Sequence, residues 1–211
     1  MNVKLNNSSG FTEVKNPYVY GDTSISRTAR YFPATLIFKP MIILSALFLI
    51  LYWKNNLHLF NKFKNEMILE NFSKKFFYFG ILSAIFLILH AIFLGIDFDS
   101  KVFTKVRKLI IIIFIFSEVS AQFFLTKSLL NSKNKIISYI NPLILKIKVV
   151  FISIAVIGSI VALLILALGD PSTSFKNILE WNYFSFLLVY YLLSRLLWRS
   201  NKNPVHTPEG A

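Results

Sequence analysis

Five blocks of apolar residues dominate this 211-residue chain and limit what it can fold into. They lie at about 36–53, 76–96, 109–126, 149–168 and 179–198. A helix rises ~1.5 Å per residue, so about 20 apolar residues cross the ~30 Å of hydrocarbon in a bilayer. We therefore expect an all-α fold, a polytopic integral membrane bundle of about five transmembrane helices, over residues 36–198.

Composition and aromatic spacing agree with a membrane protein. Apolar residues make up 55% of the chain, more than a water-facing surface accommodates, so a soluble globule is excluded. Tyr52 and Trp53 close the first block, and Trp181 and Trp198 bracket the fifth. Because a 17-residue spacing spans ~26 Å of helix, these residues are expected in the aromatic belts at the two membrane surfaces.

The ends of the chain are polar. Residues 1–35 lack a basic start followed by an apolar stretch, so we expect no cleavable signal peptide, and the first block must direct insertion itself. Residues 199–211 form a polar C-terminal tail. Between the third and fourth blocks, Asn141 and Pro142 interrupt an apolar stretch, so residues 135–146 either lie at the membrane interface or extend the fourth block.

The net charge of +13 is explained by the positive-inside rule, because Lys and Arg cluster at the block ends; no nucleic-acid partner is expected. One membrane surface receives residues 54–75, 127–148 and the tail, with 12 Lys and Arg residues; the other receives nine. This bias predicts an N-terminus outside and a C-terminus in the cytoplasm.

Polar residues inside the blocks are the candidates for chemistry. Glu118 lies near the middle of the third block, and Gln122 and Thr126 follow at helical spacing, so the three should face other helices. In the second block His90 shares a stripe with Gly80 and Ser83, and we expect it to be the partner of Glu118.

We assign His90, Glu118 and Gln122 to a candidate intramembrane polar site. Such a group is either a hydrogen bond between helices or a proton relay or ligand site. The fourth block carries small residues instead, Ala155, Gly158, Ser159 and Ala162, which predict close helix packing. In the fifth block, Glu180 suits the first turn of a helix because the helix dipole favours a carboxylate there.

The last three blocks carry a resemblance to a known family. The features are Ser117-Glu118-Val119-Ser120-Ala121-Gln122, the basic loop, the small-residue block, and Leu179-Glu180-Trp181 before the aromatic-rich Phe184-Ser185-Phe186 and Tyr190-Tyr191-Leu192-Leu193. Together they resemble the damage-regulated autophagy modulator family, whose superfamily includes GPI-lipid-remodelling membrane proteins. The resemblance covers about half the chain.

That resemblance implies a non-enzymatic membrane protein concerned with lipid handling or with tethering other proteins. It also implies six spans and a cytoplasmic C-terminus, with Glu180 and Trp181 as the matched positions. This chain departs from the pattern, since we count five blocks and Phe32-Pro33 precedes the first block instead of following it.

The residue inventory does not match the enzyme signatures we considered. The three His are scattered, Cys is absent, and no zinc motif, nucleophile elbow or phosphate loop is present. Asp97 and Asp99 form a close carboxylate pair, which we expect to be solvated loop charge because basic residues follow it. No catalytic residue, metal ligand or cofactor is assigned.

We therefore expect a non-enzymatic multi-span protein that interacts with lipid or tethers other membrane components; its partners would be membrane lipids and other membrane proteins. The alternative is a small carrier or channel-like protein with a polar route through His90, Glu118 and Gln122. A third option is a membrane-embedded enzyme that uses Glu118 as an acid or base.

Overall fold

The computed structural model describes residues 15–29, 32–62, 72–94, 96, 101–136, 139–169 and 171–199. Within these ranges the regular structure is helical. The helices are α1 (Ile25–Thr28), α2 (Ala34–Lys62), α3 (Phe72–Phe93), α4 (Lys101–Asn131), α5 (Lys133–Ile136), α6 (Pro142–Leu168) and α7 (Thr173–Leu197). The all-α prediction is confirmed. Asp97 and Asp99 lie outside the described residues.

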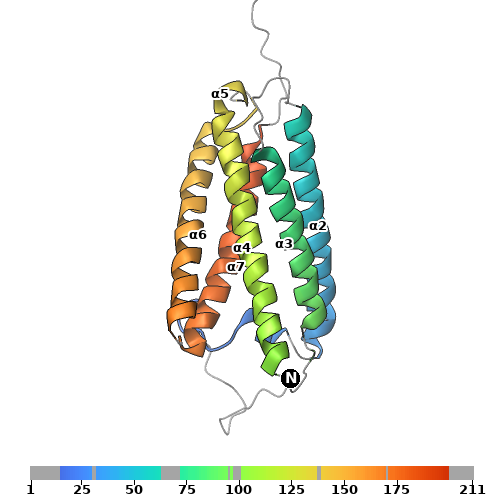
Figure 1. Cartoon of the computed structure of the whole chain (residues 1–211), viewed down its shortest axis with the longest axis vertical. Coiled ribbons are helices and arrows are strands. Elements are labelled where there is room, and N and C mark those ends of the chain that lie inside the picture. The colour runs from blue at the N-terminus through green and yellow to red at the C-terminus, as the bar shows by residue number, and fades with distance from the viewer. Residues whose placement is uncertain are drawn as a thin grey trace, which may run out of the picture.

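The five long helices form an up-and-down bundle (Figure 1). In the view of Figure 1, α2, α3, α4 and α6 stand side by side, α7 lies behind them, and α5 caps one end. The backbone contacts agree, because α3 packs on α2 and α4, and α6 packs on α4 and α7. Since each long helix runs opposite to the one before it, α7 begins at the end of the bundle farthest from α5.

Four of the described helices are long and apolar enough to cross a membrane, namely α2, α3, α4 and α6. They correspond to the first four predicted blocks. Helix α7 has the length of a span, but Lys176, Glu180, Asn182 and Arg195 leave it without an apolar stretch comparable to those of the other four. An integral multi-pass membrane protein is therefore supported, while the predicted count of five is not confirmed.

Helix α2 continues past the end predicted for the first block, up to Lys62. As a result Trp53 lies in the bundle core, with 0% exposure and its ring tilted against Phe76 at a centroid distance of 6.1 Å. Tyr52 is also turned inward, donating a hydrogen bond to Ser194 of α7 at 3.1 Å. The prediction that these two aromatics lie in an interfacial belt is wrong, because the helix does not end beside them.

Asn141 and Pro142 start helix α6 and thereby decide between the two alternatives for residues 135–146. The Asn141 side chain accepts a hydrogen bond from the Leu143 backbone N–H at 3.0 Å, and Pro142 occupies the first turn, where its missing N–H costs nothing. Residues 142–146 thus extend the fourth block. Just before them, Ile140 pairs with Trp198 in an antiparallel bridge that fixes the end of α7.

Candidate functional site

Glu118 on α4 is the centre of a buried hydrogen-bond network. Its side chain is 1% exposed, and three donors from three helices surround its carboxyl group. Ser83 Oγ of α3 donates to Oε2 at 2.7 Å, Gln122 Nε2 donates to Oε1 at 2.9 Å, and the hydroxyl of Tyr191 on α7 donates to Oε1. A polar group at the depth of the hydrocarbon core needs hydrogen-bond partners inside the protein, and the carboxyl group of Glu118 has them.

The stripe predicted on the third block faces inward, as expected. Gln122 and Thr126 are 2% and 3% exposed, so the face that carries Glu118 is buried along about two helical turns. Thr126 Oγ1 lies 2.5 Å from the hydroxyl of Tyr190 on α7, within hydrogen-bond distance. The Oε1 atom of Gln122 is buried and has no hydrogen-bond partner among the described residues.

His90 does not join this network. Ser83 occupies the place expected for it beside Glu118, and His90 lies seven residues farther along α3, or ~10 Å. Half-buried there, it is within electrostatic range of Arg107, near the α3–α4 connection. The predicted contact fails because helix depths counted from the connecting loop did not give the register in which α3 and α4 pack. Two of the three candidate residues, Glu118 and Gln122, therefore meet.

Lys148 on α6 is a second ionisable group in the interior, and sequence reasoning missed it. We placed it among the basic loop residues before the fourth block, but α6 begins six residues earlier, and Lys148 is 0% exposed. Its Nζ donates to Ser194 Oγ at 2.5 Å and lies 3.9 Å from the centroid of the Tyr190 ring, a cation–π geometry. The helix-starting pair Asn141 and Pro142 was the signal that could have located it.

Tyr52 links the partners of Glu118 to the partners of Lys148. Its hydroxyl donates to Ser194, the same acceptor that Lys148 uses, and its ring meets the Tyr191 ring edge to face with centroids 5.1 Å apart. Ser194 in turn donates to the Tyr190 carbonyl at 3.0 Å. Side chains from α2, α3, α4, α6 and α7 thus form one network. Most of its hydrogen-bond donors are paired with acceptors that belong to the same network.

Glu180 and Trp181, the residues matched by the family resemblance, lie outside this network and contact another part of the chain. They hold the segment that precedes α2, residues 16–29, which we call the N-terminal strap. Glu180 Oε1 accepts from the Ser26 backbone N–H at 2.9 Å, and Trp181 Nε1 donates to the Thr23 carbonyl at 2.9 Å. Both bonds fasten strap backbone to the second and third turns of α7. Because α7 begins at Thr173, Glu180 is the eighth residue of the helix, and the prediction that it lies in the first turn is wrong.

Gly21 allows the strap to approach α7 closely. Its φ of +64° is a left-handed conformation, and a Cβ at this position would lie 2.1 Å from the Ser174 carbonyl oxygen. The Gly21 carbonyl accepts a hydrogen bond from Asn177 Nδ2 at 2.8 Å. In the structure, therefore, the polar first half of α7 serves to bind the strap.

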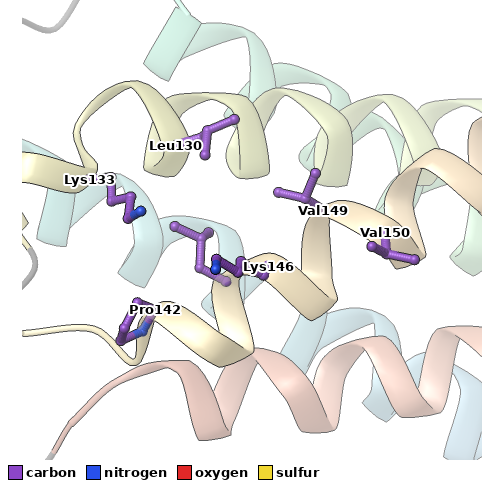
Figure 2. Close-up of a pocket in the computed structure, with 7 residues that line it drawn as sticks. Leu130, Lys133, Pro142, Lys146, Val149 and Val150 are labelled. Carbon is purple, nitrogen blue, oxygen red and sulfur yellow. The ribbon is translucent and has the colours of Figure 1, made fainter.

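A groove of about 260 Å³ lies on the outside of the bundle, between α4 and α6 beside α5. Its lining is almost entirely apolar, and two lysines border it, Lys133 toward one end and Lys146 near the middle (Figure 2). The lining residues are Leu130, Lys133, Pro142, Leu145, Lys146, Val149 and Val150. No sequence pattern indicated this groove, because it depends on how α4, α5 and α6 pack against one another.

Within the part of the chain that the structure describes, no three His, Asp or Glu side chains gather closely enough to hold a metal ion. The chain matches no protein-family model, no curated protein and no solved structure. The resemblance to the damage-regulated autophagy modulator family stays a prediction, and the geometry of the network and the groove carries the functional argument.

Proposed function

We propose that this protein is a non-enzymatic, multi-span membrane protein that works by holding lipid against the outside of its helix bundle. The observation that carries the proposal is the apolar groove between α4 and α6, which is open to the side of the bundle. Its floor includes Leu145, which is 1% exposed, and its rim includes Val150, which is 57% exposed. An acyl chain is the apolar, flexible group that a lipid-facing groove of this kind accepts.

The buried network supports a non-catalytic interior. Glu118 already accepts three hydrogen bonds, and Lys148 already has an acceptor and an aromatic face. A polar transport route through His90, Glu118 and Gln122 would need the three side chains on one path, and Ser83 stands where His90 was expected. We therefore rank lipid binding above the carrier or channel-like reading.

Helix α7 is, in this proposal, a fifth transmembrane helix that turns some of its polar residues into the bundle, while Asn182 and Arg195 are exposed. Tyr190 and Ser194 are buried against α4 and α6, so the sequence of α7 is more polar than its lipid-facing side. Five crossings place the termini on opposite sides, with the N-terminus outside. Because the chain has no Cys, single cysteines at Ser9 and Ser200 can be labelled with an impermeant thiol reagent, and labelling of both in intact cells would refute the topology.

Lipid retention by the purified protein tests the function directly. The detergent-purified chain would be incubated with equimolar dioleoylphosphatidylcholine and dioleoylphosphatidylglycerol and weighed by native mass spectrometry. We expect one tightly retained lipid per chain, and this test counts it whichever headgroup it carries. Val149→Trp, which fills the groove, should lower this retention about tenfold, whereas Ile157→Trp, at a lipid-facing position of α6 that is 62% exposed, should not. A wild-type chain without retained lipid, or equal retention by both variants, would contradict the proposal.

A further inference from the structure

The groove has no lysine at one of its ends, and its two lysines lie toward the other end and the middle (Figure 2). Figure 2 shows Lys133 and Pro142 toward one end of it and Val149 and Val150 toward the other, with Lys146 between them. Lys133 belongs to α5 and Lys146 to the second turn of α6, so both ammonium groups lie near the end of the bundle that α5 caps. Val150 lies four residues farther along α6 than Lys146, or ~6 Å deeper toward the middle of the membrane.

Neither ammonium group has a partner inside the described part of the chain. Lys133 is half-buried and Lys146 is exposed, and neither makes a hydrogen bond or an ion pair with a described residue. The described acids lie elsewhere: Glu118 is in the bundle interior, and Asp22 and Glu180 are at the opposite end with the strap. Two positive charges therefore stand at the mouth of an apolar groove without a nearby described carboxylate.

The combination of two lysines and an apolar groove matches one class of membrane molecule. A phospholipid has an anionic headgroup at the depth of the membrane interface and apolar chains that run toward the bilayer centre. Basic pockets between transmembrane helices, near the membrane surface, recognise such headgroups through Lys and Arg. A zwitterionic headgroup carries a compensating cation and gains less from two lysines.

We infer that the groove between α4 and α6 is a binding site for an anionic phospholipid, with the phosphate held by Lys133 and Lys146 and an acyl chain packed against Leu145 and Val149. The inference rests on the proposed function and names the lipid class that the same groove takes. The headgroup charge determines the preference, and the apolar lining holds the chain.

The test measures which lipid is retained. A lysine near the membrane surface raises the affinity for an anionic lipid roughly fivefold. With two lysines, the wild type should therefore prefer dioleoylphosphatidylglycerol about 30-fold when it competes with dioleoylphosphatidylcholine. The double variant Lys133→Gln/Lys146→Gln should lose most of this preference and still retain lipid. Lys54→Gln/Lys62→Gln removes the same charge from exposed positions on α2 and should keep the preference.

The possible results separate this inference from the proposed function. A wild-type chain that retains no lipid refutes both, whereas equal retention of the two lipids refutes the anionic preference alone. A preference that survives in Lys133→Gln/Lys146→Gln, or that falls equally in Lys54→Gln/Lys62→Gln, also overturns the inference. The inference is also overturned if the wild type forms a dimer without bound lipid and this dimer dissociates in the Lys133→Gln/Lys146→Gln variant. A second copy of the chain would then cover the groove. Unfolding temperatures of all variants in phosphatidylcholine show whether each one is folded.

Discussion

Lys146 and Lys148 are two residues apart on α6 and have opposite environments. Two residues turn a helix by ~200°, so one side chain points to the groove and the other into the bundle. Lys148 is fully buried and held by Ser194 and the Tyr190 ring, while Lys146 is exposed and has no partner among the described residues. The same residue type therefore joins helices on the inside and is available to a ligand on the outside.

Two glycines show the same contrast between the interior and the lipid-facing surface. A Cβ on Gly80 of α3 would lie 2.2 Å from Cδ2 of the buried Trp53, whereas a Cβ on Gly158 of α6 would have no heavy atom within 4 Å. The predicted close packing at Gly158 is therefore wrong. Residue type alone does not reveal a role in this bundle, because the face of the helix determines it.

The largest expected effect comes from removing the acceptor at the centre of the interior network. Glu118→Leu leaves Gln122 and Tyr191 with donors facing an apolar side chain, whereas the Ser83 hydroxyl can turn to the Gly80 carbonyl at 2.8 Å. A buried donor without an acceptor costs about 1–3 kcal/mol, so the free energy of unfolding should fall by about 3 kcal/mol or more. In thermal unfolding followed by gel filtration, this corresponds to a decrease in Tm of roughly 6–12 °C.

Glu118→Gln is the matched control for that change. Gln keeps the shape and one oxygen acceptor, and the hydroxyl groups of Ser83 and Tyr191 can rotate to suit it, so we expect a Tm close to that of the wild type. If Glu118→Gln were as damaging as Glu118→Leu, the negative charge itself would be required. The network would then be more than a set of hydrogen bonds between helices.

A smaller effect is expected from the two glycines. Gly80→Ala forces a methyl group into the Trp53 ring, and overpacking of this kind costs about 1–3 kcal/mol. Gly158→Ala adds the same methyl group on an exposed face and should leave the Tm unchanged or slightly higher, because Ala favours the helix. Equal Tm values for the two variants would show that α2 and α3 do not pack as closely as the structure has them.

Much of the fold follows from the sequence, because membrane insertion depends on local apolar length. The four apolar helices and the inward face of Glu118, Gln122 and Thr126 could be predicted for this reason. The hydrogen-bond partners of the buried polar residues could not be predicted. Choosing Ser83 over His90 depends on the register between two helices, and the burial of Lys148 depends on where α6 starts and which helix covers it.

The groove and the strap were beyond prediction for a related reason. The groove is formed by residues of α4, α5 and α6 that are individually ordinary. The strap meets α7 through contacts between residues that are more than 150 positions apart, such as Ser26 and Glu180. Glu180 and Trp181 could be singled out from the sequence, but their bonds to strap backbone required the structure.

The most direct test of the inside–outside contrast compares Lys146→Met and Lys148→Met by Tm in nanodiscs of dioleoylphosphatidylcholine and of dioleoylphosphatidylglycerol. The wild type should be more stable in the anionic lipid by a few degrees, because a ligand that binds the folded state stabilises it. Lys146→Met should reduce this lipid-dependent gain. Lys148→Met should shift the Tm equally in both lipids, since its ammonium contacts Ser194 and Tyr190 and not the headgroups. A gain that is lost in Lys148→Met and intact in Lys146→Met would contradict the account.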